Sequence, residues 1–134
     1  MQFYDNAITL FFSKQLDWVA DTVKVALLTS GYVFNPAHQY VSSLNLGSNG
    51  VGTPITLTGK TFVGRVADAD DGTFVGLTGS PVVGLAAYKD TGNPATSPLI
   101  FYDDSAVGFP YVPNGTDTPI EWDNGDNKIF RVTG

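Results

Sequence analysis

The stretch that most directly indicates the fold is Thr22-Val23-Lys24-Val25-Ala26-Leu27-Leu28-Thr29-Ser30. Apolar side chains alternate with Lys24 and Ala26 as far as Leu27, and a period of two is typical of a β-strand. Leu28 interrupts the alternation, so we expect both faces of the strand to be covered near its end. The sequence thus predicts a sheet with this strand well inside it.

Further short strands follow this one, separated by turn signals rich in Gly, Asp and Asn. The segments between these turn signals are predicted to form strands at residues 55–57, 61–67, 73–77, 82–89, 99–102, 119–122 and 128–132. The Asn124-Gly125 pair predicts a hairpin between the last two. Short strands at this spacing favour a mostly β fold, an antiparallel β-sandwich or open barrel.

The N-terminal segment has helical periodicity instead. Residues 3–14 are predicted to form a helix because four large apolar residues recur at helical spacing on one stripe: Tyr4, Ile8, Phe11 and Phe12. An amphipathic helix normally buries such a stripe against its own domain, so we expect core packing here.

A second short helix is predicted at residues 37–44, with Tyr40, Val41 and Leu44 facing inward. Residues 45–53 (NLGSNGVGT) are expected to form a flexible connector because they are rich in Gly, Ser and Asn. With antiparallel strands from residue 55 onward, residues 1–134 are expected to form a single domain, the usual size for one.

Composition and charge exclude several classes of function. The chain has no cysteine, which excludes thiol catalysis and Cys-based zinc sites. Its net charge is −6 with scattered basic residues, so we expect neither nucleic-acid nor membrane partners. Charged residues are only 15% of the chain, a surface that suits permanent contact with neighbours. The first residues have no secretory signal pattern, so we expect synthesis without export.

Residues that could carry catalysis or bind a metal are few and fit no pattern. His38 is the only histidine, and the spacing within residues 68–72 fails the calcium-loop pattern. Asp103, Asp104 and Glu121 could supply an acid pair for glycoside hydrolysis only if the fold brings them together. We therefore expect no catalytic, cofactor-binding or metal-binding residues and no cofactor. A hydrolase that uses these carboxylates and His38 is the enzymatic alternative.

One long connection, residues 105–115, is unusual because it is apolar and contains two prolines. Loops normally face water, so such a loop either covers the end of a sandwich core or binds a partner. Rigid apolar side chains bury area at low entropic cost, which favours an interface. The candidate interface residues are Val107, Phe109, Tyr111 and Val112.

Blocks along nearly the whole chain resemble, in their order, small virion proteins of tailed bacteriophages. They are residues 3–7 (FYDNA), 16–18 (LDW), 21–29 (DTVKVALLT), 57–61 (LTGKT), 67–71 (ADADD), 88–92 (YKDTG), 97–100 (SPLI) and 120–123 (IEWD). Each block alone is weakly specific, and their joint order carries the resemblance. Residues 45–53 and 105–115 match least.

The resemblance implies a non-enzymatic structural protein of the virion, most simply a capsid decoration (cement) protein that stabilises the head. Its implied partners are the major capsid protein and copies of itself, and its implied location is the virion, after synthesis in the host bacterial cytoplasm. A neck, collar or tail component is one alternative. A carbohydrate-binding module that stacks sugars on Trp18, Trp122 and the six tyrosines is another.

Overall fold

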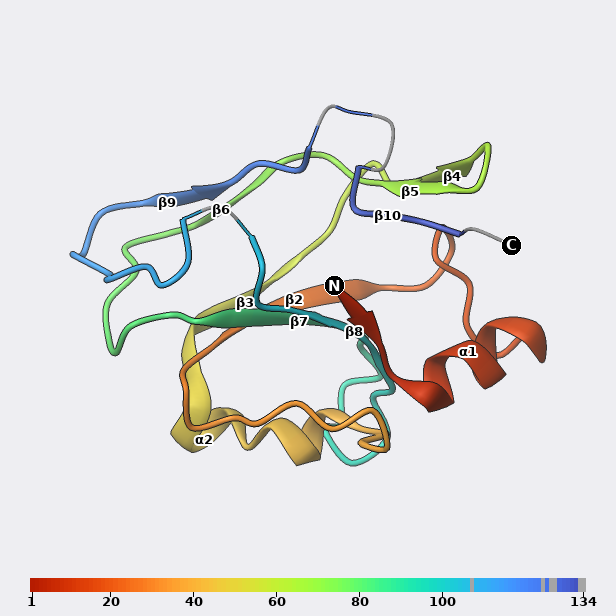
Figure 1. Ribbon diagram of the computed structural model, residues 1–134, viewed down its shortest axis with the longest axis horizontal. Coiled ribbons are helices and arrows are strands. Elements are labelled where there is room, and N and C mark those ends of the chain that lie inside the picture. The colour runs from red at the N-terminus through yellow and green to blue at the C-terminus, as the bar shows by residue number, and fades with distance from the viewer. Residues whose placement is uncertain (107, 124, 126–127, 133–134) are drawn as a thin grey trace.

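A five-stranded antiparallel sheet lies at the centre of the computed structural model, which describes residues 1–106, 108–123, 125 and 128–132 (Figure 1). Its strands, in spatial order, are β1 (Gln2–Phe3), β8 (Leu99–Asp103), β7 (Gly84–Lys89), β2 (Val23–Leu28) and β3 (Gly50–Thr56). Strand β2 is buried on both faces from Val25 to Leu28, as its sequence predicts.

A second layer of short strands lies above this sheet (Figure 1). One part is the three-stranded sheet of β10 (Phe130–Arg131), β5 (Val66–Asp68) and β4 (Thr61–Val63), in that spatial order. The other part is the antiparallel pair of β6 (Gly72–Phe74) and β9 (Thr118–Ile120). The prediction of a mostly β, antiparallel, sandwich-like fold is therefore confirmed.

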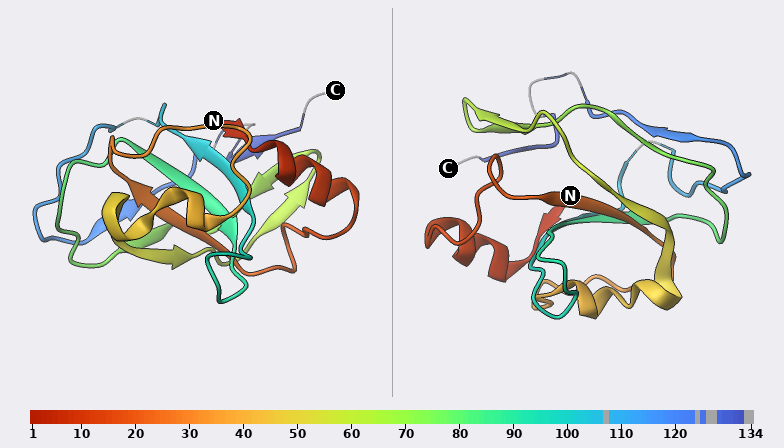
Figure 2. Two further views of the ribbon diagram at one scale, coloured as in Figure 1. Left: turned by 90° about the horizontal axis from the view of Figure 1, so that it is seen from below. Right: turned by 180° about the vertical axis from the view of Figure 1, so that it is seen from behind.

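Helical segments and a long loop cover the opposite face of the central sheet (Figure 2). They are α1 (Asp5–Phe12), the 3-10 helix η1 (Val41–Leu44) and α2 (Leu46–Asn49). Between the loop and the sheet, the hydroxyl groups of Tyr4 and Tyr32 are 2.8 Å apart, and Tyr32 is 2.8 Å from Nδ1 of His38. Burial raises the pKa of Tyr4 far above its ordinary value. Within the described ranges, no helix could cross a membrane.

The helical predictions were only partly right. The first helix occupies Asp5–Phe12 of the predicted residues 3–14, because β1 precedes it. In residues 37–44 only the last four are helical, and Tyr40 forms a β-bridge with Pro98. The predicted connector, residues 45–53, contains α2 and the start of β3. Asn45 adopts a left-handed conformation (φ 51°), which ends η1 and lets α2 begin at once.

The strand predictions need two corrections. Residues 61–67 form two strands, β4 and β5, because Gly64 and Arg65 both have positive φ and make a tight hairpin turn between them. The predicted hairpin around Asn124-Gly125 is wrong, because the strands on its two sides do not pair with each other. Strand β9 pairs with β6, and β10 pairs with β5. Asn124 and residues 126–127 of that turn lie outside the described residues.

The buried ring of Phe130 joins the two layers. Its centroid lies 5.0 Å from that of Phe3 and 6.0 Å from that of Phe101, both in the central sheet. Trp18 (5.2 Å) and Phe62 (6.4 Å) pack on it from other sides. The indole of Trp18 also donates a hydrogen bond to the carbonyl oxygen of Thr61, 3.1 Å away, which holds β4 over this cluster.

Buried tyrosines predict a loss of stability at alkaline pH. Burial raises the pKa of Tyr88 from 10.0 to about 12. Between these two values the unfolded chain ionises this tyrosine and binds fewer protons than the folded chain, so stability falls as pH rises. Replacing it (Tyr88→Phe) should reduce that fall by up to about 1.4 kcal/mol per pH unit. Urea unfolding at several alkaline pH values measures this, and an unchanged pH dependence would contradict it.

Candidate contact surfaces

The predicted interface loop is partly packed onto the domain. The backbone of Tyr111 exchanges two hydrogen bonds with Val82, of 2.7 and 2.9 Å, and its hydroxyl lies 3.0 Å from that of Thr118. Phe109 and Tyr111 are half-buried, whereas Val112 is 67% exposed. Val107 lies outside the described residues. The loop thus divides its apolar side chains between the domain and the solvent.

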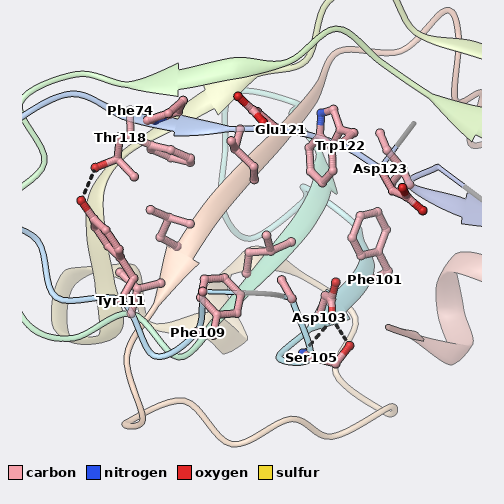
Figure 3. A pocket seen from close by; sticks show the side chains of 18 of the residues that line it. Phe74, Phe101, Asp103, Ser105, Phe109, Tyr111, Thr118, Glu121, Trp122 and Asp123 are labelled. Carbon is pink, nitrogen blue, oxygen red and sulfur yellow. Dashed lines mark hydrogen bonds between the residues drawn. The ribbon is translucent and has the colours of Figure 1, made fainter. Parts of the chain in front are cut away.

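Beneath the loop is a pocket of about 600 Å³ between the central sheet and β9 (Figure 3). Phe109 and Tyr111 line it from one side, and Phe101 and Trp122 line it from the other. The indole Nε1 of Trp122 is buried without a hydrogen-bond partner among the described residues. This arrangement favours the covering role for Phe109 and Tyr111. It leaves Val112 as the described side chain of the loop that could reach a partner.

Two carboxylates of the hydrolase alternative, Asp103 and Glu121, line this same pocket (Figure 3). Asp103 accepts hydrogen bonds from both the backbone and the hydroxyl of Ser105, at 2.9 and 2.8 Å.

His38 lies on the other side of the central sheet from this pocket. It contacts Tyr32, which packs on Tyr102, whereas the neighbouring Phe101 faces the pocket. Within the ranges described above, no three His, Asp or Glu side chains gather closely enough to hold a metal ion. The structure therefore keeps the histidine away from the carboxylates.

A larger apolar surface, which the sequence did not predict, lies between α1 and the strands β4 and β10. We call it the α1 groove; its volume is about 1000 Å³. Its floor is made of Phe3, Phe11, Leu16, Trp18 and Phe130. Its exposed apolar walls are Ile8, Phe12, Val19, Phe62 and Val132. Figures 1 and 2 show α1 at one end of the molecule, with the β4–β5 hairpin above it.

The groove exists because α1 buries a different face from the one predicted. Tyr4, immediately before the helix, and Ala7 are fully buried, and Phe11 is half-buried. Ile8 is 41% exposed and Phe12 is 88% exposed, so the predicted core packing of the whole stripe is wrong. The small side chain of Ala7 lets the helix lie close to the sheet, and this rotates the two larger residues toward solvent.

Five exposed apolar residues in one groove exceed ordinary scatter. Single exposed apolar residues are normal on a soluble protein and require no explanation. Given their exposed fractions, the five wall residues present on the order of 500 Å² of apolar surface, the upper range of the largest patch on a typical monomer. The groove is therefore a candidate contact surface.

The rim of the groove carries charges of both signs. Lys14, Arg131 and Asp17 line it. Three other lysines of the chain form ion pairs with aspartates, namely Lys24, Lys89 and Lys128. Lys14 and Arg131 form no ion pair with any residue that the structure describes. Counted over the described residues, the rim of the groove therefore carries two cations and one carboxylate, on a chain of net charge −6.

The aromatic residues of the carbohydrate-binding alternative are mostly buried. Trp18 lies in the core, as do four of the six tyrosines: Tyr4, Tyr32, Tyr88 and Tyr102. Trp122 and Tyr111 are half-buried in the pocket beneath the loop, and Tyr40 is 37% exposed. Few aromatic faces are therefore left for a sugar to stack on.

Comparisons with known proteins do not add a relative. No model of a protein family matches this chain, and no curated protein sequence matches it. The contact surfaces and the resemblance in the sequence are therefore the basis for a functional proposal.

The covering role of the loop predicts a stability effect. The variant Tyr111→Phe removes the hydroxyl that bonds to Thr118, and it should lower the free energy of unfolding by about 1 kcal/mol. Tyr40→Phe is the matched control, because the Tyr40 hydroxyl makes no hydrogen bond within the described part of the chain. Urea denaturation compares the two. Equal stability of both variants would show that the loop is not held in this way.

Proposed function

We propose that this protein is a non-enzymatic structural subunit of a tailed-phage virion, and that it acts as a capsid decoration protein. The observation that carries the proposal is the α1 groove, where five of the exposed large apolar side chains gather in one place. The ordered resemblance along the chain supports the virion setting. The low charge density supports a life in permanent contact with neighbours.

A decoration protein stabilises a shell by binding its assembled form preferentially. A subunit that binds the assembled shell and not its separated parts adds its binding free energy to the cost of opening the shell. This role requires contact surfaces and no chemistry. The chain offers two such surfaces, the α1 groove and the exposed Val112 of the loop, which is not among the residues that line the groove.

Mass spectrometry of purified virions, with copy numbers, tests the location. Decoration of the head predicts a copy number at least equal to the number of capsomers in the shell, because each capsomer offers a site. A copy number far below it would place the protein in the neck, collar or tail instead. Absence from purified virions would contradict the proposal altogether.

The exposed loop predicts a binding defect. The variant Val112→Asp should weaken binding to capsids that lack the protein at least about tenfold, because a carboxylate would lose its hydration in the contact. Its fold should be unaffected, since Val112 is 67% exposed. Val33→Asp is the control, because Val33 is 77% exposed and lies outside both surfaces. Sedimentation of capsids with bound protein measures this, and equal binding of both variants would exclude the loop as the contact.

A further inference from the structure

We propose that the α1 groove receives a second copy of this chain, in a two-fold symmetric dimer in which Phe12 of each protomer enters the groove of the other. The inference deepens the proposed structural role and rests on it for its biological setting. It assigns one of the two contact surfaces to self-association and leaves the Val112 loop free for the shell.

Shape is the first argument. A two-fold interface must be self-complementary, because the same patch is present on both partners. The α1 face carries both a protruding side chain and a space that could receive one. Phe12 is the last residue of α1 and is 88% exposed, the highest value among the large apolar residues that the structure describes. The groove beside it is floored by Trp18 and Phe130.

Area is the second argument. A standard stable interface buries about 800 Å² on each partner, of which a little over half is apolar. The wall residues of the groove expose on the order of 500 Å² of apolar surface, which matches the apolar share of one such face. One two-fold contact would therefore use the patch as a whole, with Phe12 as its aromatic anchor.

Charge is the third argument. Two copies of a chain with net charge −6 repel each other over most of their surface. At this rim there are two cations, Lys14 and Arg131, and one carboxylate, Asp17. Copies that meet here bring together rims whose described residues include more cations than carboxylates, and a two-fold axis can place a cation of one copy opposite Asp17 of the other.

Analytical ultracentrifugation of the full chain over a wide range of concentrations tests the proposal. The natural sequence should sediment as a monomer–dimer equilibrium. The variant Phe12→Asp should raise the dimer dissociation constant at least about tenfold. A second variant, Val132→Asp, should act in the same direction from the opposite wall of the groove. Val33→Asp, which is exposed elsewhere, should dimerise like the natural sequence.

The outcomes separate this inference from the proposed function. Circular dichroism and urea unfolding confirm that each variant is folded, as the exposure of Phe12 and Val132 predicts. A chain that stays monomeric at all concentrations, or a dimer that Phe12→Asp leaves intact, overturns the inference. If the chain stays monomeric but still binds capsids, the inference is overturned and the proposed function stands. If the chain dimerises but is absent from virions, the proposed function is overturned and the inference stands.

Discussion

The Phe130 ring lies where the two layers of the molecule meet, and its packing holds the upper layer in place. Phe3 and Phe101 contact it from the central sheet, and Trp18 and Phe62 also pack on it. Aromatic pairs of this kind each contribute about 0.5–1.5 kcal/mol beyond the burial of their area. The strands of the upper layer are only two or three residues long, so their ladders alone could not fix its position.

The groove follows from the same packing. Phe130, Phe3 and Trp18 occupy the space between the edge of the central sheet and β5, and they form a floor that α1 cannot enter. The helix is instead held from below, where Tyr4 is buried with its hydroxyl 2.8 Å from that of Tyr32. Its outer face, which carries Phe12, therefore lies beside the aromatic floor and is left without a cover in the monomer.

The sequence predicted the mostly β fold because alternation along 22–27, and short apolar segments between turn signals further on, are local signals. It missed the turn at Gly64-Arg65, since an arginine with positive φ has no local signature. It missed the groove because the burial of α1 depends on how closely Ala7 approaches the sheet. One local signal was present: Phe11 and Phe12 are consecutive, so they point about 100° apart and only one can face the core centrally. The loop that carries Phe109 and Tyr111 could be recognised from its apolar sequence. Which of its side chains are exposed depends on tertiary packing, which the sequence does not show.

Hydrogen exchange of the variant Phe130→Leu tests most directly whether this ring holds the upper layer. The backbone amides of Ile129 and Val132 donate to the carbonyl oxygens of Ala67 and Arg65 across β10 and β5. If the ring ties this sheet to the rest, these amides should exchange much faster in the variant, while the β2 and β7 amides of the central sheet keep their protection. Unchanged exchange at Ile129 and Val132, or an equal loss of protection across both layers, would contradict the account.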